Sequence, residues 1–108
     1  MKRRKVAIPV FGSQVSLRCD CAPEVLFLEI ENGEVVSRKR TALEGMNPLE
    51  RIGAISASGV TLLACGALPG FYRRMIEGSG IQIIQVEGMP VAELLERLKE
   101  GKLPGVGT

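Results

Sequence analysis

Short apolar runs separated by polar turns dominate the first half of the chain. Residues 5–11 are mostly apolar or β-branched, which predicts a strand that is buried on both faces. Residues 25–30 and 35–42 form two further strand-like runs, and Asn32-Gly33 between them is typical of a tight hairpin turn. We therefore expect these two strands to pair antiparallel. Residues 12–23 are rich in turn formers and predict a long irregular loop.

Helical periodicity begins after Gly45. Asn47 is a good N-cap, with Pro48 at the first helical position and Glu50 three residues past the cap, so the pattern predicts a helix ending near residue 58 or 59. Residues 60–65 form an apolar strand closed by a glycine, and Gly70 opens a second helix that ends near residue 78 or 80. A strand over 81–86 and a helix over 91–98 follow, and residues 101–108 are expected to fray.

The order of these elements is three strands, then three helices with two strands between them. It predicts a three-layer α/β domain with three helices and a five-stranded mixed sheet, in which the strands numbered along the chain lie in the order 3-2-1-4-5. The length of 108 residues suits a single domain, 1–108, with a core at about 5–103.

Composition indicates a soluble protein. Hydrophobic residues make up 45% of the chain, and no apolar run approaches the roughly 18 residues of a membrane span. The basic start resembles a signal peptide, but Pro9 interrupts the apolar stretch after it, so we expect a cytoplasmic protein. The net charge is +2 and the basic residues are scattered, which disfavours nucleic acid as a partner and gives no reason to expect a membrane.

The chain has three cysteines, an odd count that together with a reducing compartment predicts free thiols. Cys19 and Cys21 lie in the loop after the first strand, and Cys65 ends the fourth. Parallel strands end at the same edge of a sheet, so we expect all three cysteines to meet at one rim, where open α/β sheets bind ligands. Cys19 and Cys21 are therefore candidate metal ligands. Cys65 is either a third ligand or a small core residue.

The segment from Gly66 to the second helix would add backbone donors to this rim. A helix N-terminus favours an anion, so Gly66, Gly70 and Phe71 are candidate cofactor-binding residues, with Arg18 adding positive charge. Thiolates beside such donors suit an anionic metal–sulfur species. Zinc suits the set less well, because three cysteines without histidine leave one of its four positions open, which an exogenous ligand or a second copy in a homodimer would have to fill.

The sequence lacks the residue patterns that common catalytic mechanisms need. The chain has no histidine, and Asp20 and Glu24 make a poor acid–base pair. The acidic cluster that catalytic magnesium needs is absent from the predicted strand ends. Arg38 to Arg40 is expected to be the solvated face of an outer strand. We expect a protein that is not an enzyme.

A distinctive set of positions runs along the chain: Ala7, Ile8, Pro9, Val10, Val15, Ser16, Arg18, Asp20, Ala22, Cys65, Gly66, Gly70 and Phe71. In these positions the chain resembles the dinitrogenase iron-molybdenum cofactor biosynthesis family, the small carriers and accessory domains related to NifX, NafY and the C-terminal part of NifB. The resemblance implies a ribonuclease H-like three-layer fold and non-enzymatic binding, carriage or scaffolding of an iron–sulfur, iron–molybdenum or related metallocluster, with donor and acceptor proteins as partners. The family commonly has an aromatic residue or histidine where this chain has Cys19.

Two functions from different classes thus remain open. In the first, the protein carries a metallocluster at the cysteine-containing rim. In the second, it is a regulatory or protein-interaction module in which the same loop contacts a partner and the thiols are incidental. Metal and sulfide analysis of protein purified without oxygen separates the two.

Overall fold

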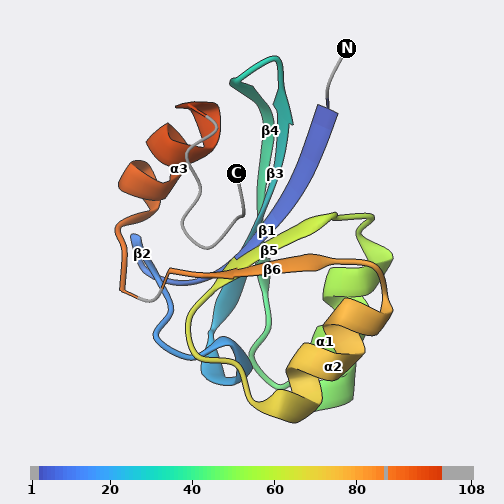
Figure 1. Ribbon diagram of the computed structural model, residues 1–108. Helices are drawn as coiled ribbons and strands as arrows, with labels where there is room; N and C mark the ends of the chain where they lie inside the picture. The colour runs from blue at the N-terminus through green and yellow to red at the C-terminus, as the bar shows by residue number, and fades with distance from the viewer. Residues whose placement is uncertain (1–2, 87, 101–108) are drawn as a thin grey trace.

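The structure is a computed structural model that describes residues 3–86 and 88–100 (Figure 1). The expected fraying of residues 101–108 and the end of the expected core, 101–103, lie outside the described residues. The elements in chain order are β1 (Arg3–Phe11), β2 (Gln14–Val15), the 3-10 turn η1 (Cys19–Cys21), β3 (Glu24–Glu31), β4 (Glu34–Ala42), α1 (Pro48–Ala57), β5 (Leu62–Cys65), α2 (Gly70–Gly78), β6 (Gln82–Gln85) and α3 (Val91–Glu100).

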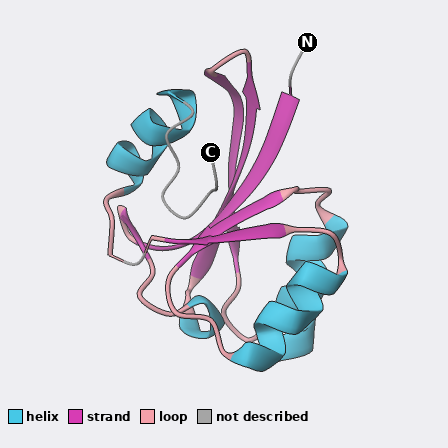
Figure 2. Cartoon of the chain, in the orientation of Figure 1, coloured by secondary structure: helices cyan, strands magenta, loops and turns pink. Residues whose placement is uncertain are grey.

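The strands form one mixed sheet in the order β4-β3-β1-β5-β6 (Figure 2). β1 pairs antiparallel with β3 and parallel with β5, and β6 pairs parallel with β5. The predicted strand order and the central position of the first strand are therefore confirmed.

The expected number of five strands is wrong, because the sheet has six within the part of the chain that the structure describes. The additional strand is β2, a two-residue strand that turns back onto the end of β1 and pairs Val10 with Val15. Gly12 makes this reversal with a positive φ of 64°. A pair of residues is too short to show a period of two, so the sequence pattern could not reveal it.

The predicted hairpin turn and the predicted N-cap of the first helix are both present in the structure. Asn32 and Gly33 both have positive φ, 54° and 82°, as a two-residue hairpin of the predicted kind requires. At the start of α1, Asn47 and Glu50 form a reciprocal capping box, in which each side chain accepts a hydrogen bond from the backbone N–H of the other.

Helices cover both faces of the sheet, as Figure 1 shows, so the predicted three-layer arrangement is confirmed. Leu94, Leu95 and Leu98 of α3 pack on one face, against a buried cluster that includes Val6 and Ile8. α1 and α2 pack on the opposite face. The second cluster contains Ala7, Cys19, Val25, Leu43, Ile52, Ile55, Val60, Leu63, Cys65, Tyr72, Ile76 and Ile81.

Candidate functional site

The loop after β2 lies directly against the segment that follows β5. The Cys19 N–H donates to the Ala67 carbonyl at 3.0 Å, and the Ala67 N–H donates to the Leu17 carbonyl at 2.7 Å. These bonds join Arg18 and Ala67 as a short parallel bridge. Two segments almost fifty residues apart in the sequence therefore form one rim, at the carboxyl ends of β1 and β5.

Gly66 makes this close approach sterically feasible. A Cβ atom at this position would overlap the backbone carbonyl oxygens of Ser16 and Leu17, so the loop can cross here only over a glycine. The sequence prediction gave Gly66 a role as a backbone donor to a ligand. The geometry gives it a structural reason as well, since it lets the loop that carries the cysteines lie on the end of β5.

Cys19 and Cys65 come together beneath the rim. Both are free thiols, both are buried, and both belong to the cluster covered by α1 and α2. Interaction with the neighbouring Cys65 thiol, and then burial, raise the pKa of Cys19 well above its ordinary value, while Arg51 opposes the shift. Cys19 is therefore a protonated thiol at neutral pH in this conformation.

Cys21 is the exposed member of the three. It lies at the end of η1, two residues beyond Cys19, and lines a groove of about 400 Å³. The groove also contains the exposed apolar side chains of Phe11 and Leu17, which are 71% and 67% exposed. The structure thus divides the predicted ligand set into a buried pair and one accessible thiol.

Arg18 lies beside Cys21 but has a carboxylate partner already. Its guanidinium donates two hydrogen bonds to Asp20, at 3.1 and 2.7 Å. The hydrogen bond to Asp20 raises the pKa of Arg18, and electrostatic interaction with Asp20 and Cys21 raises it further. Asp20, which the sequence offered only as a weak acid–base candidate, serves here to orient Arg18 at the mouth of the groove.

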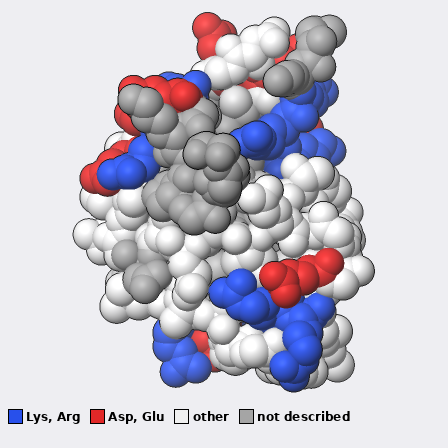
Figure 3. Space-filling model, in the orientation of Figure 1, with Lys and Arg blue, Asp and Glu red and all other residues white. Residues whose placement is uncertain are grey.

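The N-terminus of α2 completes the rim. Its N-cap, Pro69, provides no side-chain acceptor, and the first turn contains no acidic residue. Gly70 and Phe71 are both exposed there, and the rings of Phe71 and the buried Tyr72 form a T-shaped pair with 5.9 Å between their centroids. Figure 3 shows basic side chains gathered over α2, which carries Arg73 and Arg74. Of these two cations, Arg73 pairs with Glu77 of the same helix at 3.9 Å.

Arg51 of α1 is a site residue that the sequence reading missed. Its guanidinium donates to the Ala22 carbonyl at 2.7 Å and to the Met46 carbonyl at 3.1 Å, so it ties the end of the cysteine loop to α1. An arginine on an amphipathic helix is usually a solvated surface residue, and its sequence position gives no sign of this contact.

Within residues 3–86 and 88–100, no group of three or more Cys, His, Asp or Glu side chains is arranged to hold a metal ion. The described residues also contain no helix that is long and apolar enough to cross a membrane.

Comparisons with known proteins agree on the fold. No protein-family model matches the chain. An uncharacterized protein of Methanocaldococcus jannaschii, MJ0580, is 24% identical over 109 residues, covering 95% of this chain and 92% of that protein. Among solved structures, the "putative dinitrogenase (mj0327)" of M. jannaschii superposes with a TM-score of 0.82 at 21% identity, covering 100% of this chain and 99% of that one. A Thermotoga protein, TM1290, described as a "putative NifB protein", gives 0.74 at 22% identity and covers 97% of each chain. At these identities the likeness establishes a shared fold.

Proposed function

We propose that this protein binds and carries an iron–sulfur, iron–molybdenum or related metallocluster at the rim formed by the cysteine loop and the start of α2. The observation that carries the proposal is that the exposed Cys21 and its neighbour Arg18 lie at the same end of the sheet as the buried pair Cys19 and Cys65 and the uncapped N-terminus of α2. Two solved structures with the same fold are named for dinitrogenase and NifB, which supports a cargo of this class. We assign the fold to the ribonuclease H-like class as part of the same proposal.

The cargo first meets Cys21, because this thiol is exposed while the other two are buried. Its sulfur would be the first ligand, and Arg18 would balance negative charge on the cluster. Cys65 and the loop residue Cys19 are buried where the loop crosses Gly66, so they would become ligands only after this loop lifts and Cys19 loses its proton. Loading is thus expected to be coupled to loop movement and to release of protons.

The proposal includes no catalysed reaction. The protein would act as a carrier or scaffold between cluster donor and acceptor proteins in the reducing cytoplasm, where free thiols persist. A homodimer that shares one cargo would supply ligands from two exposed Cys21 thiols.

Anaerobic reconstitution tests the proposal. The protein is incubated with ferrous iron and sulfide, and separately with tetrathiomolybdate, then desalted and analysed for metal, sulfide and visible absorption. Stoichiometric uptake that falls at least severalfold in Cys21→Ser, but not in the matched helix variant Gly53→Ala, supports cluster binding. Absence of stoichiometric metal in the native protein, under conditions that load a known cluster carrier, excludes it.

The alternative function is a regulatory or protein-interaction module with incidental thiols. Two observations favour it: Cys19 and Cys65 are buried in the core, and the exposed apolar side chains of Phe11 and Leu17 line the groove at Cys21. It predicts a colourless protein whose partner binding survives replacement of all three cysteines.

A further inference from the structure

β4 is an edge strand with one open side. It has nine residues and pairs with β3 along its length, and it is the first strand in the sheet order. Its outer row of backbone N–H and C=O groups therefore has no strand partner within the described residues. The opposite edge, β6, has four residues and is uncharged. β4 is the edge that offers a long template for a further strand.

Three consecutive cations occupy the middle of β4. The register places Arg38 opposite Leu28 and Arg40 opposite Leu26, on the face covered by α3, while Lys39 lies opposite Phe27 on the other face. All three side chains are exposed. Among the described residues Arg38 and Lys39 form no salt bridge, whereas Arg40 donates to the Glu24 carboxylate at 3.0 Å.

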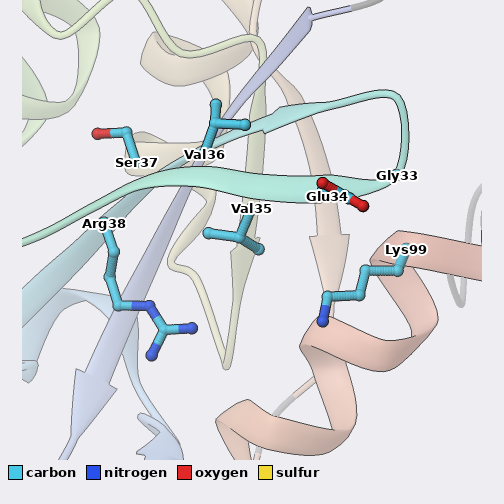
Figure 4. Close-up of a pocket in the computed structure, with 7 residues that line it drawn as sticks. All are labelled: Gly33, Glu34, Val35, Val36, Ser37, Arg38 and Lys99. Atoms are coloured by element: carbon cyan, nitrogen blue, oxygen red, sulfur yellow. The ribbon is translucent and has the colours of Figure 1, made fainter.

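The α3 side of this edge is hollowed. Arg38 of β4 and Lys99 of α3 line one open groove of about 740 Å³, in which Glu34 is the acidic member. Figure 4 shows Val35 between these two cations, of which Lys99 also pairs with Glu96 at 3.7 Å. A second hollow of about 480 Å³ adjoins it, since Arg38 lines both. Arg40 lines this second hollow together with the apolar Leu26, Val91 and Leu95. The trough beside β4 thus combines an apolar floor with a row of cations.

We infer that β4 is a docking edge for an extended acidic segment of a partner protein, which adds to the sheet as a further strand. Arg38 and Arg40 are two residues apart on one face, so they match carboxylates at alternate positions of an added strand. The free backbone groups of β4 would form the main-chain hydrogen bonds to the added strand. Every second side chain of that strand would enter the trough, and the side chains between them would lie on the other face of the sheet.

Charge selects this occupant over two others. A second copy that pairs all nine residues of its own β4 across a two-fold axis would place Arg38 opposite Arg38, which is destabilising. Residues 101–108 of the same chain carry one lysine and no acidic side chain, so their sequence does not complement the trough. An acidic strand would place carboxylates beside Arg38 and Arg40, whereas a second β4 would place a cation opposite Arg38 and residues 101–108 would place no acidic side chain beside either.

The test uses the full chain and a short synthetic peptide in which glutamate alternates with valine, with binding measured by fluorescence anisotropy. Binding should weaken as salt rises, and should fall roughly tenfold or more in Arg38→Glu/Lys39→Glu. The matched control Arg73→Glu/Arg74→Glu, which makes the same change of net charge on α2, should bind as the native protein does. Both variants are checked by circular dichroism.

Backbone pairing is tested separately from charge attraction. N-methylation of the peptide at one alternating set of residues should abolish binding, while methylation at the other set should leave it largely intact, because only every second N–H of an added strand faces β4. Equal effects of both sets, or no effect of either, overturn strand addition. Tighter binding of a single-stranded oligonucleotide than of the peptide, lost in the same β4 variant, also overturns the inference, since it assigns the cations to nucleic acid.

Discussion

The three cysteines differ in what surrounds their sulfur atoms. Cys65 is fully buried and Cys19 is 4% exposed, whereas Cys21 is open to solvent. Thiol chemistry needs both access and a thiolate, so one position should dominate the reactivity of the native protein.

Iodoacetamide should therefore alkylate one thiol rapidly in the native protein at pH 8. We expect Cys21 to react about a hundredfold faster or more than Cys19 and Cys65, because the buried pair must wait for local opening. Peptide mapping after timed quenching measures the three rates. Fast labelling of Cys19 in the Cys21→Ser variant would show that the loop is already open.

The raised pKa of Cys19 makes stability depend on alkaline pH. The unfolded chain releases this proton above its ordinary pKa of 9.0, and the folded chain retains it, so the free energy of unfolding should fall as pH rises above about 9. One such proton gives a slope of about 1.4 kcal/mol per pH unit. Burial also raises the pKa of Tyr72, which adds a decrease of the same sign at higher pH. Urea unfolding from pH 8 to 10.5 should show a shallower slope in Cys19→Ala, while the control Gly53→Ala, which removes no titratable group, keeps the native slope.

Gly66 and Gly53 form a matched pair for testing the loop crossing. Gly66→Ala should lower the free energy of unfolding by about 2–3 kcal/mol and speed alkylation of Cys19, because its Cβ displaces the loop backbone. A Cβ at Gly53, within α1, meets nothing within 4 Å, so Gly53→Ala should stabilise the protein by about 0.5–1 kcal/mol. Denaturant unfolding compares the two. Similar stabilities of both variants would mean that the loop does not depend on this contact.

At the scale of elements, one side chain connects α1 with the cysteine loop. Arg51 donates to the carbonyls of Ala22 and Met46, which holds the end of η1 against the helix. Hydrogen bonds from a charged donor contribute about 1.5–3 kcal/mol, so this contact is a principal restraint on the loop.

Replacement of Arg51 should therefore loosen the loop more than it loosens the fold. Arg51→Ala is expected to speed alkylation of Cys19 at least severalfold and to lower the free energy of unfolding by about 1–3 kcal/mol. Arg51→Lys keeps the charge but cannot reach two carbonyls with a fork, so it should recover only part of the protection. Full protection of Cys19 in Arg51→Ala would show that other contacts suffice to hold the loop.

The same elements show how far the sequence leads. Strands, helices and their order follow from apolar periodicity, and the hairpin and helix cap follow from Asn32-Gly33 and Asn47-Pro48, which act over a few neighbouring residues. β2 escapes detection because it is shorter than one period. The meeting of the two rim segments follows from topology, but the burial of Cys19 and the exposure of Cys21 depend on how η1 turns, which no local pattern encodes.

At the scale of the whole molecule, the proposed cluster rim and the β4 docking edge use different surfaces joined by one side chain. Arg40 of β4 donates to the carbonyl of Gly12, at the turn between β1 and β2, and to Glu24 at the start of β3. Arg38 and Lys39 make no such contact among the described residues. Substitution of Arg38 or Lys39 should thus affect only the β4 docking edge. Substitution of Arg40 should affect both the docking edge and the cluster rim.

Three variants separate these cases. Arg38→Glu/Lys39→Glu should lose the acidic peptide and keep native metal uptake, and Cys21→Ser should lose metal and keep native peptide affinity. Arg40→Gln should weaken the peptide about two- to fivefold and also speed alkylation of Cys19, because the turn at Gly12 loses a hydrogen bond of 2.8 Å. Measuring anisotropy, metal content and alkylation rate on each variant distinguishes the outcomes. Loss of metal uptake in Arg38→Glu/Lys39→Glu would contradict this division, since it would make the β4 cations part of the cargo site itself.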